Sequence, residues 1–287
     1  MVLQMKTCVS SYSYGKYMSE KYLGIFAVIE HAAKSGFDGI EFVEGDWQNE
    51  PGLPEKMREH CEKCGITPVA YLVGADLLDG KEEIARVEGL VDIAERLGTK
   101  LMRHDVCSGV RGRKYGRGYD DVLPVLADRA REITKYAEQK GIRTMTENHG
   151  QFSQDACRVE KLINKVAHPN FGALVDIGNF LCVDEDPNIS VGIMAPYAFH
   201  VHAKDFFVKS GMEVNPGEGW FTSRAGNYLR GTIIGHGNAG VAQSIKTIVN
   251  SGYDDYITVE FEGMEDNIQG IELGLKNLKK FIELAKS

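Results

Sequence analysis

The sequence lacks a long hydrophobic run. No apolar stretch approaches the ~20 residues that a membrane-spanning helix needs. The first ten residues, Met1–Ser10, also lack the basic region followed by an apolar segment that marks a secretory signal. We therefore expect a cytoplasmic protein with no membrane partner.

The cysteines show no disulfide framework and no zinc-binding pattern. The chain has six of them, scattered along its length. Cys61 and Cys64 have CxxC spacing, but no second Cys pair or Cys/His pair follows at the spacing of a zinc site. The pair also falls near the end of an expected helix, where a cysteine usually acts as a small apolar residue. Unpaired thiols fit a reducing compartment.

Basic residues are too few to suggest a nucleic-acid partner. The chain has 33 lysines and arginines against 41 acidic residues, a net charge of −8. Such a surface repels phosphate backbones. The hydrophobic content of 43% and the charged content of 26% are ordinary for a globular protein. Because α/β barrels of 287 residues commonly form one domain, we expect residues 1–287 to do so.

Strand-like and helix-like segments alternate from end to end. Eight short apolar or β-branched runs are expected to be strands: Thr7–Ser10, Gly39–Val43, Thr67–Val73, Lys100–Arg103, Arg143–Glu147, Phe171–Asp176, Phe199–His202 and Tyr256–Phe261. Segments with helical periodicity lie between them: Tyr22–Ser35, Leu53–Cys64, Glu82–Leu97, Val122–Lys140, Cys157–Val166, Val241–Asn250 and Asn267–Ala285. A glycine just past the last turn ends several of these helices, as at Gly36, Gly65 and Gly98.

This alternation predicts a parallel sheet with helical crossovers. Eight strands favour closure into a (β/α)₈ TIM barrel. The alternative is an open doubly wound sheet, which usually carries a glycine-rich dinucleotide turn after its first strand. The residues after the first strand here, 10–15, do not form that motif.

Two stretches, 108–118 and 207–230, fit no element. Both follow strands, so they are expected at the C-terminal face, where barrel enzymes build substrate pockets.

Four residues stand at the ends of the last four expected strands: Glu147, Asp176, His202 and Glu260. In a barrel, the C-terminal ends of neighbouring parallel strands meet at one mouth. Three carboxylates packed together would repel one another unless a cation offset their charge. Carboxylates with one imidazole suit a divalent ion. We therefore expect one bound ion, Mn²⁺ first, with Mg²⁺, Co²⁺ or Zn²⁺ as alternatives.

Several motifs across the chain resemble the sugar isomerase/epimerase superfamily with the xylose isomerase-like barrel, which includes ketose 3-epimerases, hydroxypyruvate isomerases and inosose dehydratases. The segments that carry the resemblance are Gly36-Phe-Asp-Gly-Ile-Glu41, Thr146-Glu147-Asn148, Val175-Asp176-Ile-Gly-Asn179, His200-Val-His202-Ala-Lys-Asp205, Ile234-Gly-His-Gly237 and the stretch Gly252 to Glu262. Together they are fairly specific for the superfamily and poorly specific for a substrate.

The resemblance implies a metal enzyme of carbohydrate metabolism. In that family the ligands occur in the chain order Glu, Asp, His, Glu, and the two glutamates also move protons, which here are Glu147 and Glu260. One would take a proton from the carbon beside a metal-polarised carbonyl, and the other would return it. Return to the opposite face is epimerisation, and return to the neighbouring carbon is isomerisation. Members of the family often pair, so a homo-oligomer is expected.

Two positions depart from the ketose 3-epimerases. Asn179 stands where those enzymes often have histidine, and Val208 stands where they carry arginine. Lys204-Asp205 instead resembles the inosose-dehydratase and dehydroshikimate-dehydratase branches, which eliminate water. The expected substrate-binding residues are His104, His149, Asn179, Lys204, His236 and Arg230. Glu41 is at least as well explained by a buried pairing as by substrate contact, and Glu262 is an alternative ligand to Glu260.

The leading hypothesis is an isomerase or epimerase of a small sugar or sugar derivative. The alternative is a lyase that dehydrates a cyclic polyol ketone at the same metal. A DNA endonuclease of this barrel type is disfavoured, because the chain is acidic and lacks histidine at the end of its second strand. A non-catalytic sugar sensor is the remaining class.

Overall fold

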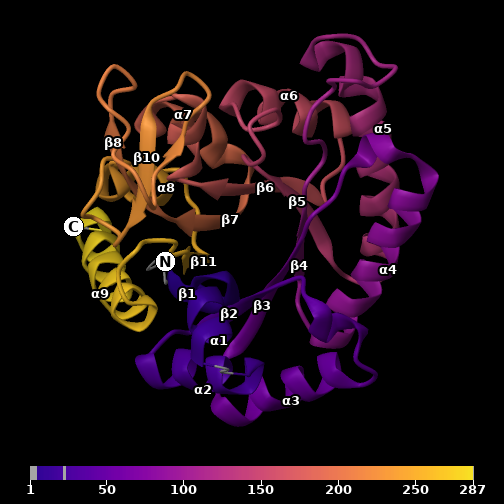
Figure 1. Cartoon of the computed structure of the whole chain (residues 1–287). Coiled ribbons are helices and arrows are strands. Elements are labelled where there is room, and N and C mark those ends of the chain that lie inside the picture. Colours follow the sequence, from indigo (N-terminus) through magenta and orange to yellow (C-terminus); the bar gives the residue numbers. More distant parts are fainter. Residues whose placement is uncertain (1–4, 22–23, 287) are drawn as a thin grey trace.

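The computed structural model describes residues 5–21 and 24–286. Within them, eight parallel strands close into a barrel in the order β1-β11-β7-β6-β5-β4-β3-β2. The strands are β1 (Lys6–Ser10), β2 (Gly39–Val43), β3 (Thr67–Val73), β4 (Leu101–His104), β5 (Arg143–Glu147), β6 (Phe171–Asp176), β7 (Ala198–Ala203) and β11 (Tyr256–Val259). The predicted (β/α)₈ barrel is confirmed, and its closure is visible in Figure 1.

Helices surround the barrel: α1 (Gly15–Lys21), α2 (Ile25–Ser35), α3 (Leu53–Cys64), α4 (Lys81–Leu97), α5 (Tyr119–Glu138), α6 (Ala156–Val166), α7 (Pro187–Met194), α8 (Val241–Asn250) and α9 (Asn267–Lys286). Short 3₁₀ helices cover Ser11–Tyr14, Asp46–Asn49, Leu77–Asp79, Asn179–Val183 and Ala195–Tyr197.

The expected helix start at Tyr22 lies outside the described residues. Gly36, Gly65 and Gly98 cap helix ends with φ of 85°, 70° and 79°, the left-handed conformation that glycine adopts without strain. None of the helices in the described ranges combines the length and apolarity that crossing a bilayer requires.

Two parts of the fold were not predicted. Helix α7 begins at Pro187, with the Asp186 carboxylate accepting a hydrogen bond from the Asn188 amide. It is short, and Gly192 and β-branched residues obscure its periodicity. The prediction that 207–230 forms no element is wrong. This stretch contains most of a small antiparallel sheet of β8 (Asp205–Lys209), β9 (Phe221–Thr222) and β10 (Tyr228–Thr232), in the order β8-β10-β9.

The barrel interior changes character along its axis. Its N-terminal part is filled by apolar side chains, among them Leu101, Met145 and Leu174. The larger apolar core lies between the strands and the helices and includes Cys61, whose burial raises the thiol pKa to about 12. Towards the C-terminal ends of the strands the interior becomes polar, because buried Glu41 and His200 replace the apolar residues. The expected catalytic end of the barrel is therefore the end where polar groups are concentrated.

Candidate metal centre at the barrel mouth

The four predicted ligands converge. Glu147 and Asp176 are the last residues of β5 and β6, His202 is the penultimate residue of β7, and Glu260 directly follows β11. A ligand atom from each lies within 4.8 Å of the others, and all four residues are buried. The strand register explains this, since Asp176 stands beside His202 in the β6–β7 pair. β11 ends at Val259, two residues before the predicted end at Phe261, so Glu260 follows the strand at the mouth.

This cluster fits a divalent cation. The Asp176 Oδ2 atom is buried without a hydrogen-bond partner among the described residues, and it faces Lys204 Nζ at 3.3 Å and His202 Nδ1 at 3.7 Å. Nδ1 also lies 3.3 Å from Glu260 Oε2. Carboxylate oxygens and an imidazole nitrogen turned towards one point form a hard-to-borderline donor set. Glu147, Asp176, His202 and Glu260 could therefore hold one ion.

An arginine that was not predicted binds the first of these ligands. Arg103, on β4, points Nε and Nη2 at Glu147 Oε2, at 2.7 and 2.5 Å. Its Nη1 lies 3.3 Å from Asp105 Oδ2. Burial alone would lower the pKa of Arg103, but Asp105 and Glu147 raise it, so the guanidinium stays charged. The available signal was its position two residues before Asp105 at the end of a barrel strand.

Lys204 enters the cluster from the other side. Its Nζ lies 2.6 Å from Glu260 Oε2, 3.3 Å from Asp176 Oδ2 and 3.6 Å from Glu262 Oε2. Burial disfavours the charged ammonium, but the surrounding carboxylates raise the pKa of Lys204 well above its ordinary value. Burial would likewise raise the pKa of Glu260, and Lys204 and His202 instead lower it. Each glutamate of the cluster is thus paired with its own cation.

Asn179 joins the two halves of the cluster. Its Nδ2 donates to Glu147 Oε1 at 2.8 Å, and its Oδ1 accepts from Lys204 Nζ at 3.3 Å. Its backbone N–H donates to Asp176 Oδ1. Asn179 and Lys204 were both predicted to bind substrate, and the structure places both against the predicted metal ligands.

A histidine–carboxylate pair stands at the rim beside Glu147. His149 Nδ1 lies 3.1 Å from Asp105 Oδ1, and the His149 side chain is 48% exposed. Burial opposes the charged imidazole, but the hydrogen bond to Asp105 raises the pKa of His149. Although burial favours a neutral carboxyl, Arg103 and His149 lower the pKa of Asp105 to about 2. A half-exposed imidazole oriented by an ionised carboxylate can exchange protons with a bound ligand.

The remaining predicted substrate-binding residues lie elsewhere. The ring centroids of His104 and Phe171 lie 6.0 Å apart, and Phe171 belongs to the core between barrel and helices. Arg103 rather than His104 therefore reaches the cluster. Strand alternation explains this, because neighbouring residues face opposite sides. Arg230 stacks 5.0 Å from the Phe207 ring centroid and 5.6 Å from that of Trp220. His236 is exposed in the loop after β10. Within residues 5–21 and 24–286, His236 belongs to neither of the residue groups that could hold a metal ion.

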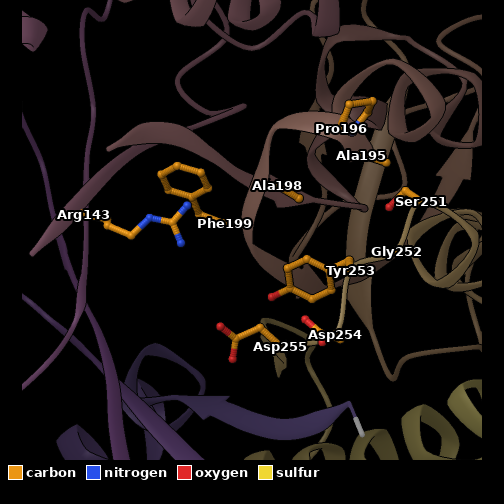
Figure 2. A pocket seen from close by; sticks show the side chains of 10 residues that line it. All are labelled: Arg143, Ala195, Pro196, Ala198, Phe199, Ser251, Gly252, Tyr253, Asp254 and Asp255. Carbon is orange, nitrogen blue, oxygen red and sulfur yellow. The ribbon is translucent and has the colours of Figure 1, made fainter. Parts of the chain in front are cut away.

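A hollow at the opposite end of the barrel is unrelated to this centre. Figure 2 shows Arg143 stacked on Phe199, opposite Tyr253 and Asp255. The cavity has a volume of about 280 Å³. Arg143 is the first residue of β5, and Asp255 immediately precedes β11. The cavity therefore lies at the N-terminal ends of strands that carry the predicted metal ligands at their C-terminal ends.

Comparison with known proteins agrees with the fold and the motifs. A family model described as a xylose isomerase-like TIM barrel matches residues 29–281. A curated relative, the 3-dehydroshikimate dehydratase of Pseudomonas putida, is 28% identical over 184 residues, which is 62% of this chain. Those residues make up 28% of that relative, so the chain spans a small part of its length.

Solved structures share the architecture. The probable 3-dehydroshikimate dehydratase AsbF of Bacillus anthracis superposes with a TM-score of 0.73 at 18% identity, over 96% of this chain and 99% of that one. A protein called IolI, whose crystal structure holds a bound zinc atom, gives a TM-score of 0.76 at 16% identity, over 98% of this chain and 99% of the other. At these identities the likeness concerns the fold.

Proposed function

Because the chain belongs to the xylose isomerase-like TIM barrel family, we propose that it is a metal-dependent lyase that removes water from a cyclic hydroxy-ketone. One observation carries the choice of a lyase. Both glutamates of the centre are held by cations, Glu147 by Arg103 at 2.5 Å and Glu260 by Lys204 at 2.6 Å.

Epimerisation or isomerisation by a glutamate pair needs both carboxylates to exchange protons with carbon. A carboxylate held by a buried cation is a weaker base, because the ion pair stabilises its charged form. Glu147 has both oxygens occupied, Oε2 by Arg103 and Oε1 by Asn179. These contacts suit a carboxylate that holds an ion through its remaining lone pairs, and they disfavour one that must accept a proton.

His149 is the better base. Its ring stands at the rim, half exposed, and Asp105 orients it through Nδ1. That contact leaves Nε2 as the atom that can accept a proton from the carbon next to the substrate carbonyl. A divalent ion bound by the four ligands would polarise that carbonyl and make the carbon acidic.

Lys204 supplies the acid. As the C–H electron pair forms the new double bond, the C–O bond at the β-carbon breaks and the hydroxide leaves. The Lys204 ammonium can donate a proton to that oxygen, so the product is water. His149 then holds the proton taken from carbon and Lys204 lacks the one given to the leaving oxygen, so exchange through solvent restores both groups. An ammonium buried among carboxylates stays protonated until it is needed.

The dehydratase relative supports the same class, since 3-dehydroshikimate is a cyclic hydroxy-ketone that loses water. A second candidate is the isomerase or epimerase that the motifs favour. It is supported by the convergence of Glu147 and Glu260 on one point.

The test is to incubate Mn²⁺-loaded protein with 3-dehydroshikimate and, separately, with a panel of ketoses. Dehydration gives a conjugated product that ultraviolet absorbance detects, whereas epimerisation leaves composition unchanged and appears only by NMR or chromatography. We expect the absorbing product, and we expect Glu147→Gln to abolish it. Ketose epimerisation without dehydration would establish the second candidate. Ligand binding that is intact in both proteins, without turnover, would indicate a sensor.

A further inference from the structure

A carboxylate inside the barrel bridges two histidines directly beneath the metal centre. Glu41 Oε2 is hydrogen-bonded to His200 Nε2 at 2.9 Å and to His202 Nε2 at 3.1 Å. Glu41 Oε1 also lies 2.9 Å from His202 Nε2, outside hydrogen-bond geometry. Thr258 Oγ1 completes the group, 3.3 Å from Glu41 Oε2 and 2.8 Å from His200 Nε2. All four residues are fully buried.

This arrangement decides which nitrogen of His202 carries a proton. An ionised carboxylate only accepts hydrogen bonds, so Nε2 of His202 must be the donor. In a neutral imidazole the lone pair then belongs to Nδ1. That atom faces Glu260 Oε2 and Asp176 Oδ2, at 3.3 and 3.7 Å.

We propose that Glu41 is a positioning residue that holds His202 with Nε2–H inward and Nδ1 towards the ion. The inference rests on the proposed function for the metal centre itself. Partners of this kind raise the basicity of a ligating imidazole and fix the orientation of its ring. Glu41 acts from β2, which carries none of the four predicted ligands and is separated from β7 by β1 and β11 in the closed barrel.

His200 and Thr258 hold Glu41 in place. Both contact Oε2, the oxygen that is also hydrogen-bonded to His202. Without them this buried carboxylate would keep only its hydrogen bond with His202 among the described residues, which is costly in a low-dielectric interior. Each partner comes from a different strand, His200 from β7 and Thr258 from β11. Closure of the barrel therefore assembles the support for His202 from three strands.

Glu41, His200 and His202 could in principle hold a second ion, because their ligand atoms also lie close together. The geometry favours protons. The N···O distances of 2.9 and 3.1 Å from His200 and His202 to Glu41 Oε2 are ordinary N–H···O separations, and only one carboxylate is present to balance a divalent charge. The inference therefore includes a count of one ion per chain.

The first measurement is Zn²⁺ affinity and stoichiometry for the full chain, by competition with a coloured chelator and by elemental analysis. We expect one ion per chain, and an affinity ~10–100-fold weaker in Glu41→Gln. Thr258→Val should give a smaller loss, because Glu41 keeps both histidines. The matched control is Glu30→Gln, which alters a Glu–His pair on the surface, with Glu30 3.0 Å from His60, and should leave affinity unchanged. Two ions per chain, or equal affinity in wild type and Glu41→Gln, would overturn the inference.

A second measurement keeps the inference testable if Glu41→Gln misfolds or if no ion binds. Proton NMR of ¹⁵N-histidine-labelled wild type, without metal, should show a protected, downfield Nε2–H resonance of His202. Zn²⁺ should then shift Nδ1 of that ring and leave the Nε2 proton in place. A His202 ring protonated only at Nδ1 would refute the positioning role. If the Nε2 proton is observed but no divalent ion binds, the hydrogen bond between His202 and Glu41 is supported. The proposed metal-dependent function is then contradicted.

Discussion

Lys204 Nζ lies 2.6 Å from Glu260 Oε2, inside a group of carboxylates that also converge on His202. The pair brings the ammonium that we propose as the acid into direct contact with a predicted metal ligand. The proposed choice of elimination over proton transfer between carbons rests partly on this contact, because a glutamate held by an ammonium is a weak base.

Replacing Lys204 with methionine should separate metal binding from turnover. Removal of the ammonium takes a competing cation from the carboxylates, so divalent-ion affinity should be equal or higher. Turnover should fall by ~10²–10⁴-fold, the usual contribution of a general acid. Calorimetric titration with Mn²⁺ and the absorbance assay measure the two effects. Lys209→Met is the control, since Lys209 is exposed and stacks on Trp220. Undiminished dehydration in Lys204→Met would refute the proposed acid.

Replacing Arg103 with methionine should destabilise the fold. The change leaves Glu147 and Asp105 without their cation, and breaking a buried ion pair by removing one partner costs about 3–5 kcal/mol. Urea unfolding in the presence of chelator gives the free energy. Arg86→Met should cost less than about 1 kcal/mol, since Arg86 pairs with Glu83 at the surface. Equal losses would show that the Arg103 pairs contribute no more than surface ones.

The pH profile should carry the signature of His149. Its pKa is raised in the folded protein above the ordinary value of 6.5. The stabilisation from its contact with Asp105 is therefore complete below that value, and it is lost as pH rises through the raised folded pKa. Turnover should show the opposite trend and increase through the same range, because a base must be neutral to accept a proton. Profiles of kcat/KM against pH for wild type and His149→Gln test this. If kcat/KM of the variant rises with pH through the same range as that of wild type, His149 is excluded as the base.

Acid should also act on Asp105. Its folded pKa of about 2 lies below its ordinary value of 3.8. The stability that this carboxylate contributes is present above the ordinary value and is lost as pH falls towards about 2. Asp105→Asn should flatten that part of the stability curve, measured by urea unfolding at each pH. If the free energy of unfolding of Asp105→Asn still falls with pH below 3.8 as that of wild type does, the predicted contribution of Asp105 is wrong.

Metal should stabilise the protein as well as activate it. An ion that binds only the folded state at 100 times its Kd adds about 2.7 kcal/mol to the free energy of unfolding. Thermal unfolding with and without Mn²⁺ should show the shift, and EDTA should reverse it. In Asp176→Asn the shift should be strongly reduced, because a carboxylate that faces the other ligands is lost. A full shift in that variant would place the ion elsewhere.

The convergence of the four ligands was predictable because it depends on local signals. Each strand run ends at or next to a carboxylate or imidazole, and parallel strands place those ends at one mouth. The roles of Glu147, Asp176, His202 and Glu260 as ligands, and of Glu147 and Glu260 as proton carriers, remain predictions. That residues 1–287 form one domain also remains a prediction, with residues 1–4, 22–23 and 287 outside the described part.

Other features could not be deduced from strand ends. His104 and Arg103 are neighbours, and which one faces the mouth depends on the register of β4 within the closed barrel. A shift of one residue would exchange them, because side chains alternate along a strand. The small sheet of β8, β9 and β10 was missed since β9 has only two residues, and its pairing with β10 is long-range.

The sequence by itself determined the barrel, the order of its strands and the acidic, histidine-bearing rim, because hydrophobic periodicity and strand-end polarity are local properties. Tertiary structure decided the partners of those acids. Arg103 reaches Glu147 across 44 residues of chain, Lys204 reaches Glu260 across 56, and Glu41 reaches His202 across 161. Such pairings exist only once the barrel closes, since closure brings side chains from distant strands into one buried volume where each charge must find an opposite charge or a hydrogen bond.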